Sequence, residues 1–218
     1  KRDIEMSMEI GFNGARLHEK IFEPRFLYYC DKAGYLVWGE HANWGLDVDS
    51  TEALLNFLPE WSESVERDFN HPSIIGWCPL NETWNNIGKN AQRIIGAIYT
   101  ETKRLDPTRP VIDTSGFCHV MTDIYDQHDY QQNTEKFRES YIGYNGKQDS
   151  FKFDDSQKQK YIPDLPLYIS EFGGLKWVPE IKKDEVPENA WGCGAPETEE
   201  EFFARYEALT AALLDAPN

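Results

Sequence analysis

Ser73-Ile-Ile-Gly-Trp-Cys-Pro-Leu-Asn-Glu82 is the stretch that decides the fold class of this chain. Its apolar run shows no strict alternation, which is typical of a parallel strand covered on both faces. Pro72 marks the loop before the strand. Asn81 and Glu82 then place two polar side chains at the carboxyl end of the strand, where parallel α/β folds bind their ligands. The stretch therefore predicts a buried strand whose end faces a ligand.

A second stretch of the same kind is Leu167-Tyr-Ile-Ser-Glu171-Phe-Gly-Gly174. It is an apolar strand pattern that ends in a glutamate and then in glycines, which let the chain turn closely past a site. Glu82 and Glu171 thus occupy equivalent positions at the ends of two expected strands. Hydrolysis of a glycosidic bond requires such a pair, with one carboxyl protonated to donate to the leaving oxygen and the other ionised to attack the sugar carbon.

Apolar periodicity predicts helices that alternate with strands along most of the chain. Helices are expected at residues 3–10, 24–33, 51–69, 89–105 and 197–214, the third of them capped by Ser50. Strands are expected at residues 12–18, 35–41, 73–82, 111–116, 124–130 and 167–171. Residues 131–160 are polar and charged, and we expect a long loop with some helix there.

This alternation indicates a parallel sheet in an α/β fold. A (β/α)8 TIM barrel explains why polar residues follow successive strands, because its active site gathers them on one face. Six expected strands do not close an eight-stranded barrel, and the chain starts in one helix and stops after another. We therefore expect residues 1–218 to form one partial barrel domain that lacks its first and last strands. An open doubly wound sheet would require a Gly-x-Gly-x-x-Gly turn for a nucleotide, and the sequence contains none.

Composition narrows the classes of partner. The 218 residues are 40% hydrophobic, which is enough apolar content to bury a core. The net charge of −16 disfavours nucleic acid and an anionic membrane surface, because both would be repelled. The four cysteines are widely spaced without a Cys-x-x-Cys pair, and we expect free thiols.

Five short motifs resemble, in the right order along the chain, the catalytic barrel of glycoside hydrolase family two, the group of β-galactosidases, β-glucuronidases and β-mannosidases. They are Phe12-Asn13 through Arg16, Tyr29-Cys30-Asp31, Asn70-His71-Pro72-Ser73-Ile74-Ile75, Asn81-Glu82 and Ser170-Glu171-Phe172-Gly173. Asn-His-Pro-Ser-Ile-Ile followed by Asn-Glu is the most specific of these signals.

The resemblance implies an exo-acting retaining glycosidase that removes a terminal β-linked sugar. In such an enzyme Glu82 is the general acid/base and Glu171 is the nucleophile. Asn81 hydrogen-bonds the 2-hydroxyl of the sugar, and Arg16 keeps the nucleophile ionised. The physical requirements agree, because the acid needs an apolar flank such as Trp77 or Trp84 and the nucleophile needs a neighbouring cation.

The sequence also departs from the family pattern. Glu19 stands where many members carry a histidine, with His18 one position earlier, and Leu80 replaces the usual glycine before Asn-Glu. The first and eighth strands and the flanking β-sandwich domains of the family are expected as parts of the parent chain. Sheet edges left open by missing strands favour self-association.

Further residues at strand ends are candidates for the site. Glu40 is a candidate lining residue. A divalent cation is possible at Glu40 and His41 but is not indicated, because neighbours in a strand point to opposite faces, and we expect no required cofactor. Asp126, His128 and Tyr130 share one face of an expected strand and are candidates for substrate contact or for an internal hydrogen-bond network. The loop tryptophans that we consider for stacking on a sugar ring are Trp44, Trp84, Trp177 and Trp191.

Two other functions remain open from the sequence. One is a clan-related barrel enzyme that cleaves inside a polysaccharide, as cellulases and mannanases do. The other is a catalytically silent protein that only binds carbohydrate.

Overall fold

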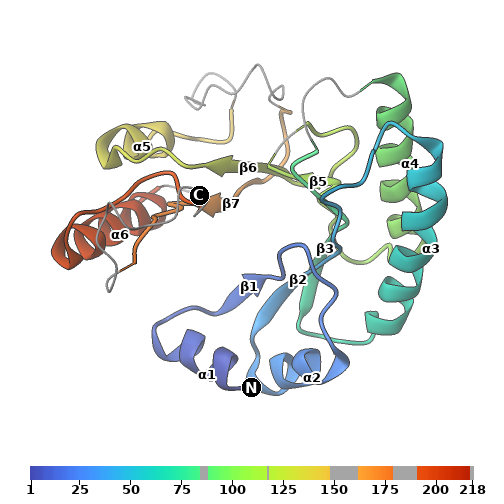
Figure 1. Ribbon diagram of the computed structural model, residues 1–218, viewed down its shortest axis with the longest axis horizontal. Helices are drawn as coiled ribbons and strands as arrows, with labels where there is room; N and C mark the ends of the chain where they lie inside the picture. Colours follow the sequence, from blue (N-terminus) through green and yellow to red (C-terminus); the bar gives the residue numbers. More distant parts are fainter. Residues whose placement is uncertain (84–87, 117, 148–161, 179–190, 217–218) are drawn as a thin grey trace. The chain divides into compact units, whose positions relative to one another are not determined.

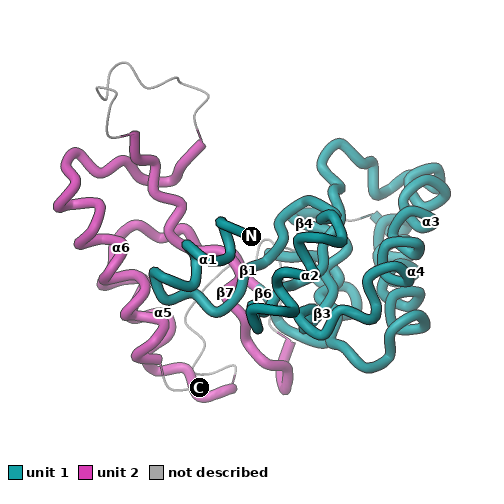
Figure 2. Tube along the Cα trace, turned by 90° about the horizontal axis from the view of Figure 1, so that it is seen from below, with its two compact units in different colours: residues 1–126 teal, residues 127–218 magenta. Residues whose placement is uncertain are grey.

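The computed structural model describes residues 1–83, 88–116, 118–147, 162–178 and 191–216. The chain forms two compact units, residues 1–126 and 127–218 (Figure 2). Among the described residues, none of the helices combines the length and the apolar character that crossing a bilayer requires.

Unit 1 alternates helices and parallel strands (Figure 1). Its elements are α1 (Arg2–Glu9), β1 (Gly14–Arg16), α2 (Pro24–Ala33), β2 (Leu36–Glu40), α3 (Thr51–Asp68), β3 (Ile74–Cys78), β4 (Leu80–Asn81), α4 (Lys89–Leu105) and β5 (Thr114–Ser115). Strands β1, β2 and β3 form one parallel sheet in that order, and β4 pairs in parallel with β5. Helices α3 and α4 pack side by side. The parallel strands bring their carboxyl ends to one edge of each sheet.

Two tryptophans fix the register of the central sheet. Trp38 of β2 lies opposite Gly76 of β3, and Gly39 lies opposite Trp77. A Cβ on Gly76 would lie 2.1 Å from the Trp38 ring, and a Cβ on Gly39 would lie 2.5 Å from the Trp77 ring. Each glycine therefore makes room for the tryptophan of the neighbouring strand, and a shift by one residue would bring rings against side chains.

Unit 2 contains two strands and two helices. They are β6 (Tyr125–Asp129), which begins in the last residues of unit 1, α5 (Thr134–Tyr141), β7 (Leu167–Phe172) and α6 (Glu199–Leu214). Strand β6 pairs with β7, and α5 packs on α6. The small core of this unit consists of Phe137, Tyr141, Leu209 and Ala212, with Leu167, Ile169 and Phe172 packed against them.

The observed elements follow the predicted order. Helices α2 and α4 have the predicted bounds, and α3 begins after Ser50, whose hydroxyl accepts the Glu52 N–H at 3.2 Å. The predicted strand at 73–82 is interrupted at Pro79, which has no N–H to donate to a ladder, and it becomes β3 and β4. The predicted strand at 111–116 is reduced to β5 and a single bridge between Val111 and Trp77.

The parallel α/β class is confirmed. The described strands form one three-stranded and two two-stranded sheets and no closed barrel. One partial domain over residues 1–218 stays a prediction. Cys30 and Cys78 are free and fully buried, and burial raises the pKa of the Cys30 thiol to about 11.

Asp106, just after α4, links three parts of the core of unit 1. Its carboxylate accepts the Trp77 indole N–H at 2.8 Å, the Arg109 guanidinium at 2.6 Å and the Thr108 N–H at 3.0 Å. Burial alone would raise the pKa of Asp106, but hydrogen bonds from Thr108, Trp77 and Arg109 outweigh burial and hold the pKa well below the usual range. The carboxylate is therefore charged and fully enclosed.

Replacing Asp106 with Asn is expected to lower the free energy of unfolding by about 3 kcal/mol near neutral pH, because Arg109 loses its charged partner inside the protein. A carboxyl whose pKa falls on folding stabilises the fold above its unfolded-state pKa. That contribution is lost as the pH falls through the folded-state pKa. The difference between wild type and Asp106→Asn should therefore narrow below about pH 4.

Urea denaturation followed by tryptophan fluorescence over a range of pH measures this difference. Glu63→Gln, an exposed position on α3, is the control and is expected to change stability by less than about 0.5 kcal/mol. If the difference in unfolding free energy between wild type and Asp106→Asn stays constant with pH, the lowered pKa assigned to Asp106 is wrong.

Candidate active site

A buried ion pair lies at the carboxyl ends of the strands of unit 1. Arg16 ends β1 and Glu40 ends β2, and their Nε and Oε2 atoms are 3.0 Å apart, with side chains 5% and 0% exposed. The guanidinium also donates to Asn81 Oδ1 at 2.9 Å and to the Ser115 hydroxyl. Four strands thus contribute one polar side chain each to a single hydrogen-bonded cluster. The cluster keeps a charged pair inside the protein because each charge has several partners.

Asn43 holds the backbone of Asn81 in a way that sequence reasoning missed. Its carboxamide oxygen accepts the Asn81 N–H at 2.6 Å, and its Nδ2 donates to the Asn81 carbonyl at 3.0 Å. These two bonds resemble the pairing that a neighbouring strand would provide. Asn43 is 7% exposed and Asn81 is fully buried. The only sequence signal was a polar residue three positions after the end of a strand.

Glu19, which departs from the family pattern, anchors the loop that carries Asn43. Its Oε2 accepts the N–H groups of Asn43 at 2.8 Å and Trp44 at 3.0 Å, and its own N–H donates to Glu40 Oε1 at 2.8 Å. Glu19 therefore connects the strand end at Glu40 to the loop that supports Asn81.

Glu82 follows β4 in a left-handed backbone conformation, with φ 44°. Its N–H donates to the Ser115 carbonyl at 2.9 Å, which continues the pairing of β4 with β5 by one residue. A residue with a Cβ adopts this conformation at a cost of roughly 1–2 kcal/mol, and such strain is concentrated at functional sites. Trp84, predicted to flank this glutamate, lies outside the described residues.

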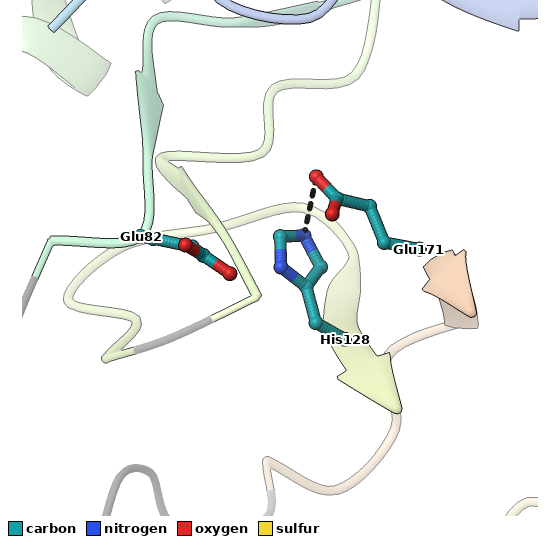
Figure 3. Close-up of side chains that lie close together, drawn as sticks. All are labelled: Glu82, His128 and Glu171. Atoms are coloured by element: carbon teal, nitrogen blue, oxygen red, sulfur yellow. Dashed lines mark ion pairs between the residues drawn. The ribbon is translucent and has the colours of Figure 1, made fainter. Parts of the chain in front are cut away.

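The second glutamate is held within unit 2. Glu171 of β7 accepts a hydrogen bond from the Tyr130 hydroxyl at Oε2. His128 Nε2 lies 3.4 Å from Glu171 Oε1 (Figure 3). The His128 side chain is 2% exposed, and its ring meets that of Tyr130 at 62° with centroids 6.1 Å apart. One side chain of β6 and one from the residue directly after it thus converge on the carboxylate of the neighbouring strand, consistent with the alternation expected for His128 and Tyr130.

Four further residues are candidate sugar contacts from the sequence, and their surroundings differ from one another. Asp126, the third residue of the predicted face, accepts the Gly116 N–H at 3.0 Å. Trp177 stacks on Phe202 of α6, with centroids 5.8 Å apart and planes at 22°. Trp44 and Trp191 are each 65% exposed. For all of these a sugar contact stays a prediction.

Glu40 and His41 have separate partners, as strand alternation predicts. Glu40 pairs with Arg16, whereas the His41 ring packs on Phe57 at 4.5 Å between centroids and near Trp61. His41 Nδ1 lies 2.8 Å from the Ala42 carbonyl oxygen. The two residues therefore do not present their side chains to one metal ion.

Comparison with curated proteins gives partial matches. The β-galactosidase of Vibrio cholerae is 35% identical over 133 residues, which are 57% of this chain and 12% of that protein. The β-glucuronidase of Chlorocebus aethiops is 30% identical over 113 residues, 50% of this chain and 17% of that protein. The chain thus spans less than a fifth of the length of these relatives.

Solved structures match over nearly the whole chain. A β-D-glucuronidase from Dictyoglomus thermophilum covers 98% of this chain with 37% of its own length, at a TM-score of 0.66 and 22% identity. A β-glucuronidase from an uncultured Clostridium species covers 99% of this chain with 37% of its own length, at a TM-score of 0.67 and 16% identity. These likenesses show that the chain shares the fold of that part of the two enzymes.

The protein-family model for the TIM barrel domain of glycosyl hydrolases family 2 matches residues 1–173, which are most of the chain. The resemblance seen in the sequence motifs is thereby confirmed, and the chain belongs to glycosyl hydrolase family 2 through its TIM barrel domain.

Proposed function

We propose that this chain carries the catalytic residues of a retaining β-glycosidase that removes a terminal β-linked sugar. The observation that carries the proposal is the setting of Glu171, a strand-end carboxylate that receives the Tyr130 hydroxyl and faces His128, in a chain of glycosyl hydrolase family 2. A carboxylate oriented by neighbouring donors is suited to attack a sugar carbon.

The reaction proceeds in two displacements. First, a Glu171 oxygen attacks the anomeric carbon while the glycosidic C–O bond breaks, and Glu82 gives its proton to the leaving oxygen. Then water attacks the anomeric carbon and gives a proton to Glu82, and the bond between the sugar and Glu171 breaks. The sugar leaves with the configuration it had in the substrate. This mechanism requires the two carboxyl groups to lie about 5–5.5 Å apart.

Asn81 supplies a hydrogen-bond donor for the substrate. Its Oδ1 is occupied by Arg16, and its buried Nδ2 has no hydrogen-bond partner among the described residues. A buried donor without an acceptor costs about 1–3 kcal/mol, which an incoming hydroxyl would recover. The sugar 2-hydroxyl is the acceptor that we propose. Arg16 and Glu40 act by orienting the Asn81 carboxamide.

The complete enzyme includes more than this chain. The chain covers 12% to 17% of the two curated relatives and 37% of the two structures described above. We therefore propose that the remaining barrel strands and flanking β-sandwich domains belong to the same polypeptide. Residues there complete the pocket and select terminal over internal sugars.

Glu171→Gln in the full-length protein is expected to lower kcat/KM at least about a thousandfold, because the amide cannot form the covalent intermediate. The measurement is the initial rate on a panel of aryl β-glycosides that includes galactoside, glucuronide and mannoside, and the sugar turned over names the substrate. Glu139→Gln, exposed on α5, is the matched control and should retain the wild-type rate. Turnover that survives in Glu171→Gln would exclude this residue as nucleophile. A wild type that turns over none of the panel would favour a carbohydrate-binding protein.

Glu82→Gln is expected to lower kcat/KM by about 10²–10⁴-fold on glycosides with poor leaving groups, because the leaving oxygen receives no proton. The loss should be much smaller on a dinitrophenyl glycoside, whose leaving group departs without protonation. Comparing the two substrates in wild type and variant measures the difference. Equal losses on both would argue against a general-acid role.

The stereochemistry of the first product tests the two-step mechanism separately. Proton NMR of the released sugar, recorded before mutarotation, is expected to show the β-anomer. An initial α-anomer would indicate inversion, which requires carboxyl groups about 6.5–9.5 Å apart. Release of internal oligosaccharides in place of the terminal sugar would indicate an endo-acting enzyme.

A further inference from the structure

Gln132 joins the two chain segments that carry Tyr130 and Glu171. Its side-chain Nε2 donates to the Tyr130 carbonyl at 2.9 Å and also to the Gly173 carbonyl. Tyr130 is two residues before Gln132, and Gly173 is two residues after Glu171. One carboxamide therefore binds both segments close to the contact between the Tyr130 hydroxyl and the Glu171 carboxylate.

The two segments that Gln132 joins lie directly after the paired strands. Strand β6 ends at Asp129 and β7 ends at Phe172, so Tyr130 and Gly173 each lie one residue beyond the end of a strand. Gly173 has φ 80°, a left-handed turn that redirects the chain directly after the strand. At these strand ends Gln132 donates one hydrogen bond to each of the two segments.

The surroundings of Gln132 hold its carboxamide in one orientation. Arg205 of α6 donates to its Oε1 at 3.3 Å and pairs through another guanidinium nitrogen with Glu201. Gly194 lies against the same oxygen, because a Cβ on this glycine would be 2.1 Å from Gln132 Oε1. The Gly194 segment is itself fixed, since the Lys176 N–H donates to the Gly194 carbonyl at 2.6 Å. With the oxygen facing Arg205, the amide N–H groups face the two carbonyls.

We propose that Gln132 is a positioning residue that keeps the Tyr130 hydroxyl on the Glu171 carboxylate by clamping the ends of β6 and β7. It acts through Tyr130 and Glu171. The proposal rests on the proposed function, because the consequence for turnover requires Glu171 to be the nucleophile. Displacement of a reacting group by about 1 Å costs up to about a hundredfold in rate, so a clamp of this kind influences kcat.

Three variants separate the clamp from general packing. Gln132→Met keeps the side-chain length and removes both N–H donors. Gln132→Glu keeps the acceptor for Arg205 but turns a carboxylate towards two carbonyl oxygens. Gly194→Ala leaves Gln132 chemically intact and displaces its carboxamide. Gln131→Met, the same substitution at the exposed neighbouring glutamine, is the matched control, and it removes the acceptor of the Asn133 N–H but neither of the bonds that Gln132 donates.

The first measurement is kcat and KM of the full-length protein and these variants, in the wild-type and Tyr130→Phe backgrounds. We expect kcat to fall about ten- to a hundredfold in all three variants, with KM changed less than about threefold. In Tyr130→Phe the further effect of Gln132→Met should shrink to less than about threefold, because the contact that Gln132 positions is already absent. Full additivity of the two substitutions, or wild-type kcat in Gln132→Glu, would overturn the proposal.

A second measurement does not depend on turnover. Hydrogen exchange followed by mass spectrometry is expected to show faster exchange in a peptide spanning residues 172–175 in Gln132→Met than in Gln131→Met. If wild type hydrolyses no glycoside, the proposed function fails. The clamp is then supported by faster exchange in the variant and overturned by equal exchange.

Discussion

The buried ion pair of Arg16 and Glu40 is the constraint on which the strand ends of unit 1 depend. Two charges withdrawn from water are tolerated only when hydrogen bonds satisfy their remaining atoms. The required partners come from different strands and loops: Asn81 and Ser115 for the guanidinium, and the Glu19 N–H for the carboxylate. Folding this part of the chain around the pair therefore also sets the orientation of the Asn81 carboxamide, the group next to Glu82 in sequence.

Packing in the sheet brings the ion pair together. The reciprocal contacts of Trp38 with Gly76 and of Trp77 with Gly39 fix the register of β2 against β3. Glu40 is the last residue of β2, so its position relative to Arg16 at the end of β1 follows from the parallel pairing of β1 with β2. Trp77 also donates its indole N–H to Asp106, which ties the register of the sheet to the end of α4. The apolar contacts thus align Glu40 with the strand that leads to Asn81, and the pairing of β1 with β2 adds Arg16.

Local signals in the sequence predicted most of the elements, but not the contacts that orient the site. Ser50 caps α3, and alternation along β6 correctly placed His128 and Tyr130 on one face, because these features depend on near neighbours in the chain. Asn43 and Gln132 gave no such signal. Each binds backbone atoms of residues 38 or 41 positions away, and a contact of that kind follows only from the tertiary fold. The missing N–H of Pro79 predicts a break between β3 and β4, but the continuous apolar run around it favoured a single strand.

The contacts of Glu171 and the backbone conformation of Glu82 can each be related to the role that we propose for the residue. Glu171 is oriented through its side chain, by the Tyr130 hydroxyl and by His128, which suits a nucleophile that must present a fixed oxygen to the sugar. Glu82 is oriented through its backbone, by a left-handed conformation and by an N–H bond to Ser115. An acid/base gives up and regains a proton in every cycle, so its position must serve both protonation states. The left-handed conformation fixes the direction of the Cα–Cβ bond of Glu82, and with it the region that the carboxyl can reach in either protonation state.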